Sequence, residues 1–75
     1  MDAATKTQII AQHHKLLDKL SEILILLAEV QQIIDSGDHS GQNFIRLSAL
    51  KAQKSSTITQ LVALDEHVAA LNRSH

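Results

Sequence analysis

Apolar residues recur every three or four positions along the first half of the chain. A spacing of three and four places side chains on one face of an α-helix. Thr5 and Gln8 have the spacing of a capping box, which favours a helix start near Thr5. We therefore predict a helix from about residue 5 to residue 34. Its apolar stripe is Ile9, Leu16, Leu20, Ile23, Leu27, Val30 and Ile34, flanked by Ile10, Leu17 and Leu24.

The second half of the chain repeats the pattern more weakly. Ser40 stands where an N-cap is expected, because its hydroxyl can accept an amide hydrogen bond, and Phe44 follows one turn later. Lys54 falls inside the stripe, and the centre of this segment is polar. We predict a second helix from about residue 41 to residue 72. Its stripe is Leu47, Leu50, Thr57, Ile58, Leu61, Leu64, Val68 and Leu71.

Turn-forming residues are gathered in one short segment between the two patterns. Both glycines, Gly37 and Gly41, lie in the segment 35–41, and the chain contains no proline. Two helices of roughly 30 residues would each be about 45 Å long, so they can pair along their whole length. The sequence predicts an all-α fold, an antiparallel two-helix hairpin resembling a coiled coil, with residues 1–75 as one domain.

The two stripes do not match along their whole length. Near the chain ends, apolar residues around Leu16 face apolar residues around Leu64. In the middle, Leu20 to Leu27 faces Leu50 to Ile58, the most polar part of the second helix. Leu26 and Ile33 fall outside the intramolecular stripe altogether. We therefore expect a partner to cover part of the first helix. The expected partner-binding residues are Leu20, Ile23, Leu24, Leu26, Leu27, Val30 and Ile33.

Composition narrows the function classes. The formal net charge is −1, and the seven Lys and Arg residues form no cluster, which argues against a nucleic-acid surface. The chain has no cysteine, as is common in a reducing compartment. The apolar run at 23–28 is too short to span a bilayer, and the N-terminal residues lack the apolar core of a signal peptide. We expect a cytoplasmic protein without membrane insertion.

Candidate chemistry is sparse. The five histidines have no zinc-binding spacing, and neither a catalytic triad nor a convergent carboxylate pair is evident. His13 lies on the apolar stripe and is expected to pack there. We expect no metal, no cofactor and no enzymatic activity. The other histidines, expected to be solvated, are His14, His39, His67 and His75.

Two binding modes remain open. A foreign protein could cover the apolar surplus, or two hairpins could pair into a homodimeric four-helix bundle. The second mode would suit a scaffold or an RNA-binding hairpin of the Rop type, which requires basic side chains collected on one face of the dimer. An amphipathic membrane-surface helix is disfavoured because the polar face of the first helix carries acidic groups.

The arrangement of motifs resembles a known family. The chain is small and lacks cysteine, and its first long helix is followed by a Gly37-Asp38 turn. Phe44 lies one turn into a second long helix, after Ser40. In these features, which extend over nearly the whole chain, it resembles the YscE-type co-chaperones of bacterial type III secretion.

The resemblance implies a specific role. A YscE-like protein binds a tetratricopeptide-like chaperone, and the pair keeps the needle subunit soluble and unpolymerised in the bacterial cytoplasm before export. Such a role in virulence-related protein transport requires an apolar face and no catalytic group. The resemblance therefore implies a heteromeric complex, with a homodimer as a possible form of the free chain.

Overall fold

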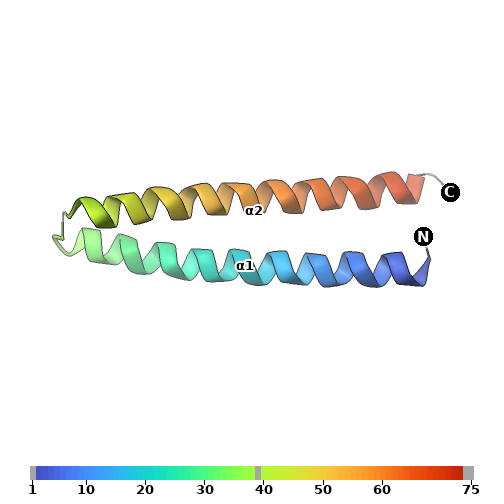
Figure 1. Cartoon of the computed structure of the whole chain (residues 1–75), viewed down its shortest axis with the longest axis horizontal. Coiled ribbons are helices and arrows are strands. Elements are labelled where there is room, and N and C mark those ends of the chain that lie inside the picture. Colours follow the sequence, from blue (N-terminus) through green and yellow to red (C-terminus); the bar gives the residue numbers. More distant parts are fainter. Residues whose placement is uncertain (1, 39, 74–75) are drawn as a thin grey trace.

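The computed structural model describes residues 2–38 and 40–73, which form two long helices. Helix α1 (Ala3–Asp35) and helix α2 (Gly41–Arg73) run antiparallel and contact each other along their length (Figure 1). The molecule is a rod with Cα extents of 56 × 16 × 14 Å. The predicted all-α helical hairpin is confirmed, and each helix begins and ends close to the predicted residue.

The start of α1 differs from the prediction. Asp2, and not Thr5, is the N-cap residue, and its carboxylate accepts a hydrogen bond from the Thr5 backbone N–H at 2.7 Å. The Thr7 hydroxyl donates to the Ala3 carbonyl at 2.8 Å. The predicted capping box is therefore wrong. An aspartate placed before two alanines offers both a stronger acceptor and good helix formers, so the helix begins earlier.

Gly37 ends α1 in a Schellman motif. Its φ of +108° lies in the left-handed region, which glycine adopts without steric cost. The Gly37 N–H donates to the Ile34 carbonyl at 3.1 Å, and the Asp38 N–H donates to the Ile33 carbonyl at 3.3 Å. The chain thus leaves the helix in a defined direction immediately before it reverses.

Asp38 joins the turn to the second helix. One of its carboxylate oxygens accepts from the Ser40 N–H at 3.0 Å, and the other accepts from the Asn43 side-chain amide at 2.9 Å. The Ser40 carbonyl accepts from the Asn43 backbone N–H at 3.2 Å. This local network fixes where α2 begins relative to α1.

The helices meet along a continuous seam in which the spacing alternates strictly between three and four residues. Such a repeat is typical of a coiled coil, in which the two helices keep one face in contact over many turns. We call the following set of buried and half-buried residues the seam: Ile9, His13, Leu16, Leu20, Ile23, Leu27, Val30 and Ile34 of α1, and Asn43, Leu47, Leu50, Lys54, Thr57, Leu61, Leu64, Val68 and Leu71 of α2.

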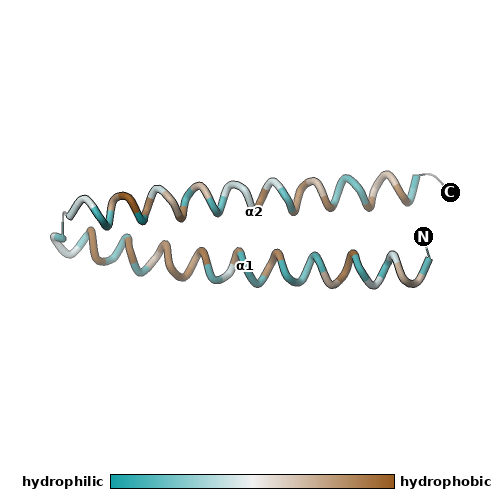
Figure 2. The backbone as a smooth tube through the Cα atoms, in the orientation of Figure 1, coloured by the Kyte–Doolittle hydropathy of each residue, from teal (hydrophilic) through white to brown (hydrophobic). Residues whose placement is uncertain are grey.

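The seam is most apolar near the turn. Val30, Ile34 and Leu50 form a buried cluster against which Leu27 and Leu47 pack. Figure 2 shows the same bias, because apolar positions are densest along α1 in the half nearer the turn. The hairpin therefore has its best hydrophobic packing next to the Schellman turn.

The contact face of α2 differs from the predicted stripe at two positions. Ile58 was placed in the stripe, but it is 41% exposed at the edge of the seam. Asn43 was not predicted to be buried, yet it is 9% exposed with its amide bonded to Asp38. The strict repeat leaves Ile58 outside the seam, because the seam passes through Leu50, Lys54 and Thr57. Asn43 is buried where the turn brings Asp38 within hydrogen-bond distance of its amide.

Candidate interaction surface

The hairpin has two long sides where the helices border each other. In an antiparallel pair whose seam occupies positions a and d of a heptad, the e positions of both helices border one side and the g positions border the other. We call the first the apolar side: Ile10, Leu17, Leu24 and Gln31 of α1 with Phe44, Lys51, Ile58 and Asp65 of α2. The second is the mixed side: Gln12, Lys19, Leu26 and Ile33 of α1 with Arg46, Gln53, Gln60 and His67 of α2.

Large hydrophobic side chains follow the apolar side at regular intervals. Ile10, Leu17 and Leu24 are seven residues apart, which is about 10 Å per step along a helix. Together with Phe44 and Ile58 they are between 41% and 47% exposed. Both helices therefore contribute to one row of half-covered apolar surface along much of the rod.

The flanks of the apolar side carry mostly small side chains and no Lys, Arg, Asp or Glu. Between residues 7 and 31, every charged residue of α1 lies on another face of that helix. Lys51 and Asp65 of α2 are the charged residues of this side. The residues that flank the row are Thr7, His14, Ser21 and Ala28 of α1 and Ser48, Ser55, Val62 and Ala69 of α2. A second helical surface can approach this row closely because no long charged side chain of α1 stands beside it.

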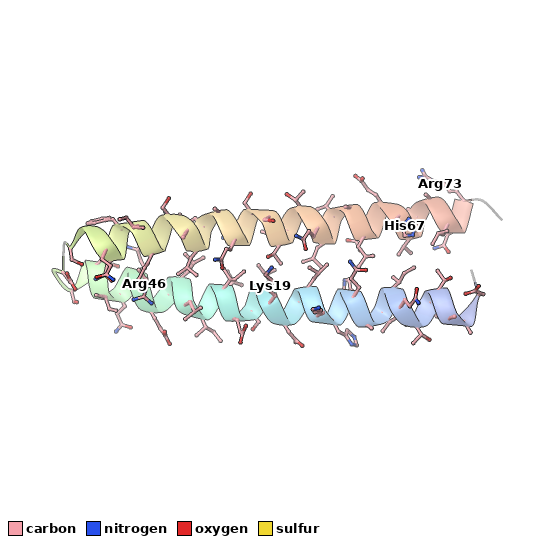
Figure 3. The ribbon with its side chains drawn as sticks, in the orientation of Figure 1. Lys19, Arg46, His67 and Arg73 are labelled. Atoms are coloured by element: carbon pink, nitrogen blue, oxygen red, sulfur yellow. The ribbon has the colours of Figure 1, made fainter. Side chains whose placement is uncertain are left out.

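The mixed side has a different character. Lys19 and Arg46 lie near the junction of the two helices in Figure 3, and His67 lies in front of α2, whereas Arg73 points away from α1 at the end of α2. A shallow depression here is lined partly by Gln12, Lys19 and Gln60. Towards the turn, this side also carries two large apolar residues, Leu26 and Ile33, which are about as exposed as those of the apolar side.

The structure divides the predicted partner-binding residues into three groups. Ile23 and Val30 are buried in the seam, and Leu20 and Leu27 are half-buried there. Leu24 lies on the apolar side, whereas Leu26 and Ile33 lie on the mixed side.

A straight-helix projection of α1 at 3.6 residues per turn does not separate the two sides. Leu17 flanks the seam as predicted, and it lies on the apolar side together with Ile58. The seven-residue spacing of Ile10, Leu17 and Leu24 is the signal that identifies the apolar side in the sequence.

Potential metal ligands are not gathered at one place in the part of the chain that the structure describes. Within residues 2–38 and 40–73, no group of three or more His, Asp or Glu side chains is placed to hold a metal ion. His13 is half-buried in the seam, and His14 and His67 are exposed; the predictions for His39 and His75 lie outside the described residues. Over the same range, neither helix is apolar enough for long enough to cross a membrane.

One carboxyl group has a shifted pKa. The Thr5 backbone N–H, followed by the Thr5 side chain, hydrogen-bonds Asp2 and lowers the pKa of its carboxyl below 3.8. Asp2 is fully exposed at the N-terminus of α1, far along the rod from the turn. The shift belongs to helix capping and marks no reactive site.

No family model matches the chain, and no curated protein or solved structure is similar enough to count as a match.

Proposed function

We propose that the chain is a non-enzymatic binding module, a helical-hairpin co-chaperone of the YscE type. Its apolar side docks on a tetratricopeptide-like chaperone, and the complex keeps a type III secretion needle subunit soluble and unpolymerised in the bacterial cytoplasm. The observation that supports this proposal best is the row of half-exposed Ile, Leu and Phe side chains contributed by both helices.

Burial of this row supplies the driving force for docking. Removing apolar surface from water stabilises a complex by about 25 cal/mol per Å², and several half-exposed Leu and Ile side chains still have area to lose. A helical groove suits a helical rod, because ridges of side chains pack into grooves between them. Lys51 and Asp65 would lie at the rim, where charges select orientation more than they add affinity.

The proposed function requires no conformational change and no reactive group. A partner that binds the folded hairpin stabilises it by mass action, so the hairpin and its chaperone would stabilise each other. A small rod with one apolar side is suited to this task because it can complete a larger helical surface. The needle subunit would then be held by the chaperone, with the hairpin as the supporting subunit.

Affinity capture from the native host tests this function. Tagged full-length protein is compared with Leu17→Asp/Leu24→Asp on the apolar side and with Leu26→Asp/Ile33→Asp on the mixed side, which is the matched control. We expect the parent and the mixed-side variant to recover a tetratricopeptide-like protein and a needle subunit. The apolar-side variant should lose both, because a carboxylate at the interface would be desolvated without a counter-charge.

Recovery of both proteins by the apolar-side variant would show that this side is not the docking surface. Loss of binding only in the mixed-side variant would transfer the site to Leu26 and Ile33. If the parent recovers neither a tetratricopeptide-like protein nor a needle subunit, the co-chaperone function is wrong. Circular dichroism on each variant confirms that the helices are intact before the comparison is made.

A Rop-type RNA-binding hairpin is the second candidate. It is favoured by the placement of Lys19, Arg46 and His67 on one side, opposite the apolar side. Glu22 and Glu29 lie on the same helix as Lys19 and reduce the positive potential there. A gel-shift titration with duplex RNA at low salt distinguishes the candidates, and the co-chaperone function predicts no shift.

A further inference from the structure

Around Leu17 and Ile58, the apolar side has an internal symmetry that only charge breaks; Gln31 and Phe44 lie beyond this part of the side, towards the turn. Along α1, Ile10 and Leu24 each lie seven residues from Leu17. Along α2, Lys51 and Asp65 each lie seven residues from Ile58. In α1, the apolar side therefore has an apolar residue on each side of Leu17. In α2, it has opposite charges at equal distances from Ile58.

The two centres lie at the same level of the rod. In an antiparallel hairpin, residues equally far from the turn along the chain lie side by side, because both helices rise by about 1.5 Å per residue. Counted outward from the turn at Gly37 and Asp38, Leu17 and Ile58 are equally distant. By the same count, Leu24 lies level with Lys51, and Ile10 lies level with Asp65.

We propose that in the free protein a second copy of this chain covers the apolar side, in the opposite orientation. The two-fold axis crosses the rod at the level of Leu17 and Ile58. This operation brings α1 against α1 and α2 against α2, and it closes with identical surfaces on both copies. Leu17 then meets Leu17 of the second copy, and Ile10 meets Leu24 of the second copy.

Charge complementarity selects this arrangement. The two-fold axis places Lys51 opposite Asp65 of the second copy and generates the same pair a second time. Lys54 adds to it, because Lys51, Lys54 and Ile58 line one shallow depression of α2. Each aspartate would therefore lie near two lysines of the other copy. These pairs would flank an apolar centre, as is usual for a rim around an interface core.

The same two charges cannot pair within one chain. Lys51 and Asp65 are fourteen residues apart on one helix, which is about 21 Å. A parallel arrangement of two hairpins, with the two-fold axis along the rod, would set Lys51 level with Lys51 and Asp65 level with Asp65. Only the antiparallel arrangement gives each charge an opposite partner.

The available surface is sufficient for a dimer. A standard interface buries about 800 Å² on each partner. The described chain exposes 5450 Å² in total, so an interface of that size would cover about 15% of its surface. One of the four long sides of a rod contributes more than this share. The proposed chaperone would require the same side, so the homodimer would be the form of the chain in the absence of a partner.

Sedimentation equilibrium on the purified full chain at low ionic strength tests the arrangement. We expect the parent to be a dimer, and we expect Lys51→Glu and Asp65→Lys, each alone, to dimerise roughly tenfold more weakly, because two attractive pairs become repulsive. An equimolar mixture of the two variants should regain parental affinity. In the mixed dimer, the introduced glutamate of one chain faces the introduced lysine of the other, and the unchanged Asp65 of the first chain faces the unchanged Lys51 of the second. High salt should reduce these differences.

A parent that stays monomeric overturns the homodimer but leaves the co-chaperone function intact, because no chaperone is present in this experiment. A dimeric parent whose two variants fail to recover on mixing overturns the antiparallel arrangement. The Leu26→Asp/Ile33→Asp control should dimerise as the parent does, and its dissociation would place the interface on the mixed side. Helical circular dichroism of all variants separates dissociation from unfolding.

Discussion

The two long sides of the hairpin are built from the same helices and border the same seam, but their chemistry differs. The apolar side carries five half-exposed large hydrophobic residues, and its charges are confined to α2. The mixed side carries two such residues, with basic and amide side chains between them. The difference arises from a seven-residue repeat in α1, which keeps the same side apolar over three successive heptads. Surface specificity in a simple coiled hairpin is thus set at the e and g positions, while the seam sets the fold.

The largest expected effect comes from the seam that both sides share. Leu64→Ala should lower the free energy of unfolding by about 2–5 kcal/mol, because the buried side chain leaves a cavity between the helices. Leu17→Ala on the apolar side is the matched control and, in protein dilute enough to be monomeric, should cost less than about 1 kcal/mol. Urea unfolding followed by circular dichroism measures both. Equal losses would mean that Leu17 belongs to the folded core and that the apolar side is not a free surface.

A smaller effect concerns the dependence of stability on protein concentration. If the apolar side is covered by association, the melting temperature of the parent should rise with concentration. Leu17→Asp/Leu24→Asp should melt at a temperature independent of concentration, and Leu26→Asp/Ile33→Asp should behave as the parent. Differential scanning calorimetry over a hundredfold range of concentration measures this. A concentration effect in the apolar-side variant would contradict the assignment of the two sides.

The seam contains a polar position that offers a gain in stability. Thr57 is fully buried, and its hydroxyl donates to the Gln53 carbonyl of the same helix at 2.8 Å. Such a bond adds little to a helix and slightly disfavours it. Thr57→Val should therefore raise the free energy of unfolding by up to about 1 kcal/mol without changing either side. A loss of stability in urea unfolding would mean that the hydroxyl has a further role in the seam.

The smallest effect is a pH dependence at the start of α1. The pKa of Asp2 is lowered in the folded state by its hydrogen bonds to Thr5. The stability that this cap contributes to the start of α1 is present at pH values above the pKa of Asp2 in the unfolded chain. It is lost as the pH falls through the lower pKa of Asp2 in the folded chain. Amide exchange at Thr5 should therefore accelerate relative to that in the seam as the pH falls below 3.8. Asp2→Asn, which caps without a titrating group, should abolish this dependence.

The hairpin itself was predictable from the sequence. The periodic stripes and the placement of Gly37 and Gly41 define two helices and one turn, and the structure confirms them. Capping was less predictable, because several residues near a helix start can act as N-cap. Asp2 competes with Thr5, and its carboxylate accepts the Thr5 N–H.

The division of the surface was harder to predict than the fold. A straight-helix projection with 3.6 residues per turn drifts relative to a 3.5-residue repeat, so over several turns it mixes the two sides of the seam. Leu24 and Leu26 were therefore assigned to one surface although they border opposite sides. Asn43 could not be predicted to be buried because its partner, Asp38, is brought to it by the geometry of the turn.

The most direct test of whether association covers the apolar side is the accessibility of a thiol placed at Leu24 or at Leu26. The chain contains no cysteine, so Leu24→Cys and Leu26→Cys each introduce a single thiol. The two leucines are similarly exposed in the isolated hairpin, which makes each variant a control for the other. Maleimide labelling is followed in dilute protein and again under associating conditions. We predict that association slows labelling of Leu24→Cys several-fold and leaves Leu26→Cys unchanged. Protection of Leu26→Cys alone, or of neither thiol, would contradict the assignment of the apolar side as the interaction surface.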